Sequence, residues 1–353
     1  MGLVFAMNSL ATVMLQVFVG YFTDKHFTEA LMKVGLIFLA FSSLMMIFSF
    51  DFWSLLIFAT LSGIALAFQH SISYATTSRM YKNNKDIMIG RQGAAGDLGK
   101  CAAVFSSAIL VIFFASWQLA LFSWTVIAFL SFVVITINFK RIKFRDYYIE
   151  ETEVDKIVLN VSENNIEKSL AILILAAFIL VAAIFTLIIT NLPTYLRVVK
   201  TGLVSELSGL FLGFTLVFGI LGAYFSGRVK LRFGMSNSII TISVFLIITI
   251  IIYLILDSSN LMTNLIFYAV LGFFLFIIYP QLLAAINDCF HSKKIGFGYG
   301  IMLSFGWIGN FIGSLVGGFL ADIYSANVFY VLGIIILIII IVILGIIKIK
   351  HSI

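Results

Sequence analysis

The sequence predicts an all-α integral membrane protein in which eleven transmembrane helices form two pseudo-symmetric bundles. Of its 353 residues, 62% are hydrophobic and 11% are charged, whereas a soluble domain is about half apolar and about a quarter charged. The mean hydropathy of +1.14 makes lipid the solvent for most of the chain. The apolar runs are about 20 residues long and do not alternate with polar residues, which selects helices over a β-barrel. The distribution of charge and an internal repeat support the same fold.

Eleven apolar runs, each bounded by polar residues, predict the helices. The first five are Gly2–Phe22, Leu31–Phe50, Phe52–Ser78, Gly90–Phe114 and Trp117–Phe139. The last six are Ser169–Leu196, Ser205–Gly227, Ser238–Leu256, Leu261–Phe290, Gly296–Ala321 and Ala326–Ile347. Between the two sets lies a long polar segment that begins basic and becomes acidic, as solvated linkers do. We therefore predict a five-helix bundle over residues 1–139, a cytoplasmic linker over 140–168 and a six-helix bundle over 169–353.

The basic residues alternate from loop to loop and so predict the orientation. Arg197 and Lys200 lie on one side, and the other 20 of the 22 Lys and Arg residues lie on the opposite side. Since cytoplasmic loops carry an excess of Lys and Arg, the basic side is predicted to be cytoplasmic. We expect a multi-pass protein of the cell membrane with a cytoplasmic C-terminus and with Met1 outside.

The two parts of the chain resemble each other at similar offsets. Tyr21–Lys25 ends the first run, and Tyr224–Arg228 ends the seventh run 203 positions later. Gly96–Lys100 in the fourth run corresponds to Gly306–Asn310 in the tenth. Matching offsets and positions indicate a duplicated bundle, which is a common plan for transporters.

The repeat also predicts a missing helix. The run Ser169–Leu196 has no counterpart in the first part, where its partner would start before Met1. The sequence therefore looks like a twelve-helix protein without its first helix. Either the true start lies upstream, so that the chain has a mis-called start or is a fragment, or the gene is shortened; we favour the former.

The stretch from Gly20 to Glu29 carries a family resemblance. Gly20, Asp24 and Lys25 match the first half of the pattern G-x-x-x-D-[RK]-x-G-[RK]-[RK] of the major facilitator superfamily, whereas Phe27–Glu29 departs from it. The second copy keeps Arg228 but has Gly227 in the acidic place, and Asn191–Leu196 is similar to the end of the family's seventh helix. The resemblance implies a major facilitator fold and transport by alternating access.

The resemblance also implies a gate formed by Gly20, Asp24, Lys25 and Arg228. In the family, the carboxylate at the position of Asp24 faces the N-terminus of the eleventh helix, which here is the run Gly296–Ala321. A carboxylate is favourable at that helix end, and Gly20 allows close helix approach. The alternative is that Asp24 and Lys25 are ordinary loop charges.

Ionisable residues within the runs indicate a solute or proton pathway, because they are costly in lipid. Asp97 and Lys100 share a helical face, and His70 is predicted at a similar depth. In one interpretation Asp97 takes and releases a proton while His70 or Lys100 contacts the solute. In the other, Asp97 and Lys100 form a structural pair. Together with residues that the resemblance places on the cavity or that the repeat aligns, the predicted pathway comprises Gln69, His70, Tyr74, Asp97, Lys100, Asn191, Tyr279, Gln281 and Asn310.

The sequence thus favours a secondary transporter for a small polar or anionic organic solute, with a proton as a second possible partner. The alternatives are a transporter-derived sensor or scaffold and a multidrug efflux permease, although Gly93–Lys100 lacks the proline of the drug-antiporter motif. No ATP-binding loop or hydrolase motif is present, so we expect no enzyme, catalytic residue, metal or cofactor. The other expected partner is the lipid bilayer, not nucleic acid, and we expect a monomer.

Overall fold

The computed structural model describes residues 2–25, 27–138, 168–193, 196, 208–256, 260–290, 294–323 and 327–351. Within these residues the chain is helical and contains no strand, and eleven helices are long and apolar enough to cross a membrane. The predicted number of spans is therefore confirmed. Of the predicted linker 140–168, residues 140–167 lie outside the described residues, as do Arg197 and Lys200, whereas Lys168 is the first residue of a helix.

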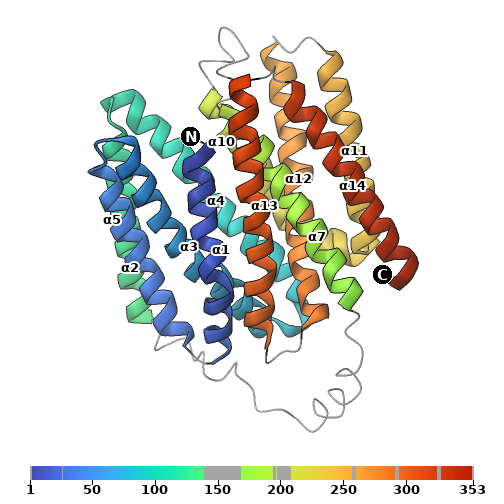
Figure 1. Cartoon of the computed structure of the whole chain (residues 1–353), viewed down its shortest axis with the longest axis horizontal. Helices are drawn as coiled ribbons and strands as arrows, with labels where there is room; N and C mark the ends of the chain where they lie inside the picture. The colour runs from blue at the N-terminus through green and yellow to red at the C-terminus, as the bar shows by residue number, and fades with distance from the viewer. Residues whose placement is uncertain are drawn as a thin grey trace.

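The helices run side by side as two groups (Figure 1). The first part of the chain forms α1 (Gly2–Asp24), α2 (Thr28–Ile47), α3 (Phe52–Met80), the short η1 (Lys82–Asn84), α4 (Lys85–Phe114) and α5 (Trp117–Asn138). The second part forms α7 (Lys168–Phe185), η3 (Thr186–Thr190), α10 (Ser208–Phe233), α11 (Met235–Ile255), α12 (Leu261–Cys289), α13 (Ile295–Ile323) and α14 (Asn327–His351). The division into domains stays a prediction.

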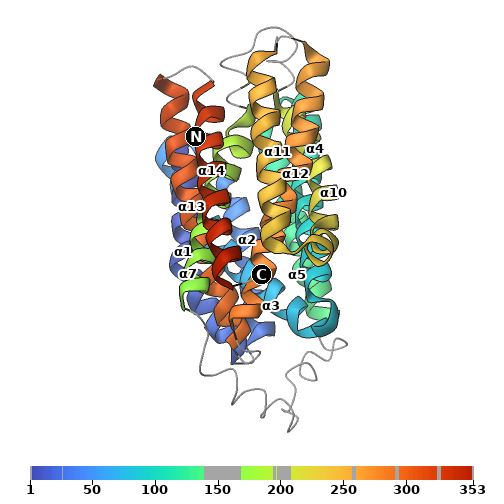
Figure 2. The same cartoon turned by 90° about the vertical axis from the view of Figure 1, so that its right-hand side faces the viewer.

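Two helix pairs join the two parts of the chain, α1 with α13 and α4 with α10. Figures 1 and 2 show the first pair on one side of the molecule and the second pair on the other. In the sequence repeat, α1 corresponds to α10 and α4 corresponds to α13. The two pairs are therefore equivalent under the pseudo-symmetry that the repeat predicts.

The end of α7 differs from the predicted uninterrupted helix. At Thr186 the backbone widens into the π-helical η3. The hydroxyl of Thr186 donates to the carbonyl of Ala182 at 3.1 Å, and Asn191 Nδ2 donates to the carbonyls of Thr186 at 3.0 Å and Leu187 at 3.3 Å. Side-chain donors of this kind compete with the backbone ladder for the same carbonyls, which favours a local change of helix type.

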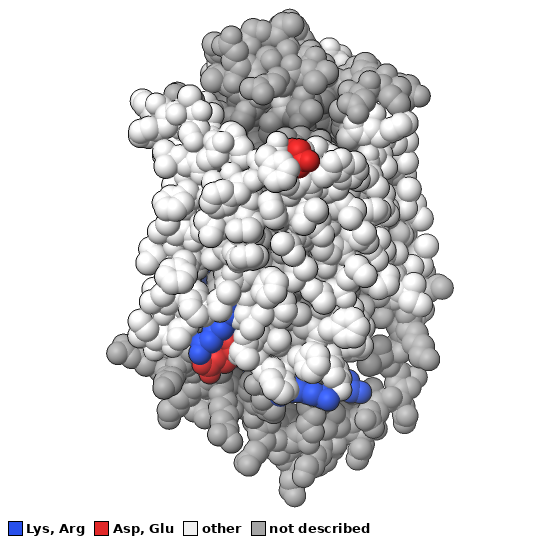
Figure 3. All heavy atoms as spheres, turned by 60° about the vertical axis from the view of Figure 1, so that its left-hand side comes forward, with Lys and Arg blue, Asp and Glu red and all other residues white. Residues whose placement is uncertain are grey.

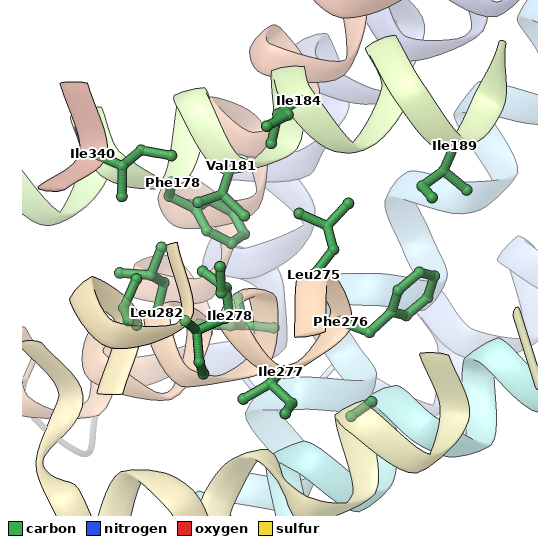
Figure 4. Packing of buried hydrophobic residues seen from close by; sticks show 14 of the residues in the cluster. Phe178, Val181, Ile184, Ile189, Leu275, Phe276, Ile277, Ile278, Leu282 and Ile340 are labelled. Carbon is green, nitrogen blue, oxygen red and sulfur yellow. The ribbon is translucent and has the colours of Figure 1, made fainter. Parts of the chain in front are cut away.

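The second part of the chain has a dense apolar core. Phe178 and Val181 of α7 face Ile278 and Leu282 of α12, with Ile340 of α14 beside them (Figure 4). The outside of the molecule is also apolar: many large hydrophobic side chains are exposed, including Phe18, Phe41, Phe129 and Ile339. Figure 3 shows one such face. It is white over most of its height, which marks residues other than Lys, Arg, Asp and Glu, and the visible Lys and Arg lie toward its lower end. Apolar exposure on this scale is typical of a surface that contacts lipid.

We call the end of the molecule that carries Asp24, Arg79 and Lys230 the basic end. Helices α3 and α10 finish there, and α4 and α13 begin there. Helix α4 begins five residues before the predicted Gly90, and α10 extends six residues beyond the predicted Gly227. These extra turns are polar and so escape a hydropathy criterion, but they carry charged side chains into the contact between the two parts.

Candidate functional site

Five polar side chains meet between the two parts of the chain, and we call them the central cluster. They are His70 and Tyr74 of α3, Asp97 and Lys100 of α4, and Tyr279 of α12. Asp97 lies near enough to both tyrosines for an electrostatic interaction, and Lys100 lies equally within electrostatic reach of His70. The structure thus brings together five of the nine pathway residues that the sequence predicts.

The two charges of the central cluster form an ion pair with unequal exposure. Lys100 Nζ lies 2.9 Å from Asp97 Oδ1, one turn earlier on the same helix. The Asp97 side chain is 11% exposed, whereas that of Lys100 is 57% exposed. Lys100 Nζ also lies 6.0 Å from the centre of the Phe185 ring of α7. The lysine therefore points across to the second part of the chain and is the accessible member of the pair.

His70 is held from two sides. Its Nδ1 lies 3.1 Å from the carbonyl oxygen of Leu66, and its ring centre lies 5.7 Å from that of Trp307 on α13 in an edge-on arrangement. Because a carbonyl only accepts, Nδ1 donates this hydrogen bond, which leaves Nε2 as the acceptor nitrogen when the ring is neutral. His70 thus links α3 to the second part of the chain.

Aromatic rings surround the central cluster. Tyr279 packs on Phe178 at 4.7 Å and on Phe185 at 6.3 Å between ring centres, and Tyr74 stacks on Tyr299 at 5.9 Å. A Cβ built at Gly93 would lie 3.6 Å from Pro280 and 3.8 Å from the Tyr74 hydroxyl, so α3, α4 and α12 converge there. The charged pair is therefore flanked by apolar faces with polar hydroxyl groups at their edges.

The other four predicted pathway residues lie elsewhere. Gln69 points to α2, where its amide nitrogen would contact a side chain at Gly35. The carbonyl oxygen of the Gln281 side chain accepts from the Ser238 hydroxyl of α11 at 2.5 Å. Asn191 folds back onto η3, and Asn310 is half-buried one turn after Trp307. Gln69 and Gln281 thus belong to contacts within their own part of the chain.

At the basic end, Asp24 joins the two parts of the chain. Its two carboxylate oxygens each accept a backbone hydrogen bond of 2.8 Å, one from Gly296 and one from Phe297, at the N-terminus of α13. Arg79 of α3 donates to the same carboxylate. Charged hydrogen bonds are worth about 1.5–3 kcal/mol each, and the helix dipole adds to them. We call Asp24, Arg79, Gly296 and Phe297 the Asp24 contact.

Glycines bring α1 and α13 close together beside the Asp24 contact. A Cβ at Gly20 would overlap the carbonyl oxygen of Gly296 and come within 3.0 Å of the Cα of Gly300. Gly20 therefore allows backbone-to-backbone packing that no larger residue permits without moving a helix.

A second polar group, the Lys230 cluster, connects α4, α10 and α12 at the basic end. Lys230 Nζ lies 2.8 Å from Asp86 and 3.6 Å from Asp288, and Lys85 Nζ lies 3.0 Å from Asp288. Nearby, the hydroxyl of Ser78 donates to the side-chain oxygen of Asn287. Polar contacts thus join the two parts of the chain at the basic end in both helix pairs.

The other two predicted gate residues remain on their own helices. Lys25 Nζ lies 4.4 Å from the centre of the Tyr21 ring. The guanidinium of Arg228 lies 5.6 Å from the centre of the Tyr224 ring and 5.8 Å from that of Phe225. Lys230, two residues further on, makes the contact between helices.

Sequence reasoning missed Arg79, Asp86, Lys230 and Trp307. The first three are charges within two turns of a helix end, and that position is the signal that could have found them. No comparable feature of the sequence pointed to Trp307.

A row of polar contacts between α1 and α3 was also missed. Asn8, Thr12 and Gln16 occur every fourth residue of α1 and form hydrogen bonds with Ser62, Gly63 and Ser71 of α3, respectively. Within the described residues, no three His, Cys, Asp or Glu side chains are grouped to hold a metal ion.

Helices paired across two related bundles, with a polar cluster between them, define the class of a membrane transporter. The family model of the Major Facilitator Superfamily matches residues 1–306, so the chain belongs to that family, which comprises transporters and not enzymes. Among solved structures, it is similar to the transporter FucP in the outward conformation, with a TM-score of 0.72 and 14% sequence identity. That match covers 98% of this chain and 89% of FucP, and it shows a shared fold. Comparison with curated proteins finds no match.

Proposed function

We propose that the protein is a secondary transporter that moves a small polar or anionic organic solute by alternating access. The observation that carries this proposal is the central cluster, an ionisable group held between the two parts of the chain. Charged side chains inside membrane helices are costly and mark substrate or ion pathways. An accessible lysine beside a covered carboxylate, within aromatic walls, suits a solute with a polar or anionic group.

We propose that the contacts at the basic end hold the closed state that alternating access requires. The Asp24 contact lies in the α1–α13 pair, and the Lys230 cluster lies in the α4–α10 pair. If both sets of contacts broke, the two parts of the chain could rock about the central cluster. Interactions made in only one state set the balance between the two states. We infer that the basic end faces the cytoplasm of a cell membrane, because 20 of the 22 basic residues are predicted on this side.

The ion pair offers a route for coupling to protons. A carboxylate next to lysine stays charged while the pair is intact and takes up a proton when the partner leaves. In this proposal Asp97 carries the proton and Lys100 contacts the solute.

Uptake into proteoliposomes tests the proposal. A panel of labelled polar, anionic and cationic solutes is offered with and without a pH gradient. We expect the gradient to drive accumulation of a polar or anionic solute.

Asp97→Asn is expected to abolish the pH-driven accumulation and to leave counterflow exchange. Loss of both by a poorly expressed variant would instead assign Asp97 and Lys100 to a structural pair. If the folded, reconstituted protein transports none of the labelled solutes, the result would favour a sensor or scaffold over a transporter.

A further inference from the structure

We propose that the central cluster binds a monocarboxylate with an aromatic or apolar body, and that one proton moves onto Asp97 when the carboxylate reaches Lys100. This inference rests on the proposed transport function and specifies its substrate class. It makes the solute and Asp97 competitors for the same ammonium group.

The position of Lys100 favours an anion. An ammonium group has three N–H donors, and among the described residues Asp97 Oδ1 accepts one of them at 2.9 Å. With more than half of the Lys100 side chain exposed, the remaining donors can reach a ligand. A Cβ built at Gly96 or Gly99 would meet nothing within 4 Å, so the surface of α4 beside Lys100 has open space.

The walls favour an apolar body on that anion. Lys100 Nζ lies 6.0 Å from the centre of the Phe185 ring, and Phe185 in turn contacts Phe276 and Tyr279. A carboxylate bound by Lys100 would place its remaining atoms against the partly exposed rings of Phe185 and Tyr279, where apolar surface is removed from water; Phe276 is buried behind them. A small hydrophilic anion would leave this surface without a partner.

The charge balance requires the proton. Lys100 and Asp97 together are neutral, so a carboxylate added to them leaves one net negative charge beside the largely covered Asp97, which is unfavourable. A proton taken from solution onto Asp97 restores neutrality and releases the ammonium for the ligand carboxylate. The loaded site then carries one proton and one anion with no net charge.

The groups around Asp97 do not replace Lys100 in this balance. Tyr74 of α3 and Tyr279 of α12 lie near Asp97, whereas His70 of α3 lies near Lys100. On the α10 side, the thiol of Cys101 contacts the carbonyl oxygen of Gly213, and α7 presents Phe185. Arg91, on α4 itself, lies over the Tyr224 ring toward the basic end.

Calorimetric titration of the purified full-length protein tests the inference with benzoate, benzamide and benzamidine. These probes share one shape and carry charges of −1, 0 and +1 at neutral pH. We expect benzoate to bind at least about tenfold more tightly than either of the others, because only it pairs with an ammonium group. Titration in two buffers of different ionisation enthalpy is expected to show uptake of about one proton per benzoate bound.

Three variants separate the roles of the residues. Lys100→Gln is expected to weaken benzoate binding at least about tenfold. Asp97→Asn is expected to keep it, or to strengthen it, without proton uptake. Arg91→Gln removes a charge from the same helix outside the cluster and is expected to match the parent. Each variant is compared with the parent by its melting temperature, so that loss of binding is not confused with loss of the fold.

The inference is overturned if benzamide binds as well as benzoate, if none of the three probes binds, if benzoate binds without proton uptake, or if folded Lys100→Gln binds it unchanged. Uptake of another polar solute by proteoliposomes in any of these cases would leave the proposed transport function standing. Absence of uptake across the whole panel would defeat the transport function itself.

Discussion

At the scale of single residues, the direction of a side chain decides whether it belongs to the site. Gln69 and His70 are neighbours on α3, and successive helical residues point about 100° apart. His70 reaches Trp307, and Gln69 reaches α2 instead. A helix that is apolar nearly all round gives no pattern that fixes which face points inward. The sequence could therefore identify the polar residues of α3 and α12, but it could not select His70 and Tyr279 over Gln69 and Gln281.

Gly20 provides a direct test of helix packing. We predict that Gly20→Ala lowers the stability of the protein in detergent by about 1–3 kcal/mol, because the new Cβ meets the backbone of α13 and the helices must move apart. Thermal unfolding followed by circular dichroism measures the change. The matched control is Gly96→Ala, whose Cβ meets nothing within 4 Å. An equal loss of stability in both variants would contradict the packing argument.

Asp24 is predicted to hold the basic end closed. Asp24→Asn keeps the shape of the side chain but removes the charge that faces Arg79 and the N-terminus of α13. We expect the open population to rise about tenfold, as the loss of about 1.4 kcal/mol implies. Cys289 is a native reporter, since its thiol is buried at the basic end of α12 beside Asp288.

The rate at which a maleimide modifies Cys289 in a Cys101→Ser background measures this opening, because a buried thiol reacts only when it becomes accessible. If Asp24→Asn leaves the labelling rate unchanged, Asp24 does not hold the basic end closed.

At the scale of helices, hydropathy located every span but not the polar turns that extend beyond the apolar core. Asp86 lies in the first turn of α4 before the predicted start, and Lys230 lies in the last turn of α10 after the predicted end. The ion pair between them therefore falls outside both predicted helices. Likewise, the apolar run of α7 gave no indication of η3, because the side-chain hydrogen bonds of Thr186 and Asn191 decide the helix type there.

The acidic and basic residues exchange places between the Asp24 contact and the Lys230 cluster. In the first part of the chain the carboxylate lies at the end of α1 and meets the N-terminus of α13. In the second part the cation lies at the end of α10 and meets a carboxylate in the first turn of α4. A carboxylate lies at a helix N-terminus in both cases, where the dipole favours it. This shared feature explains why Gly227 can occupy the place of the acidic residue.

A double-mutant cycle tests whether Lys230 and Asp86 act as one pair. Both side chains are largely covered, at 12% and 15% exposure, so we expect a coupling of about 1–3 kcal/mol. Lys230→Gln and Asp86→Asn should each speed the labelling of Cys289, and the double variant should be no faster than the faster single variant. Arg228→Gln is the control and should label like the parent. Additive effects of the two single changes would mean that the residues act separately.

At the scale of the whole molecule, the two helix pairs make the basic end and the opposite end interdependent. Helices α1 and α13 touch from the Asp24 contact to Gly2, whose Cβ would lie 3.0 Å from the Cα of Gly318. The pair α4 and α10 is equivalent to it under the repeat. Two parts that are joined along both pairs are expected to rock as bodies, so that opening at one end brings the other end together.

Paired spin-label distances at both ends test this claim most directly. One pair at Tyr81 and Leu231 reports on the basic end, and another at Phe50 and Ile255 reports on the opposite end; all four side chains are exposed. We predict that combining Asp24→Asn with Lys230→Gln lengthens the first distance and shortens the second. Two distances that stay fixed, or that lengthen together, would contradict alternating access between the two parts of the chain.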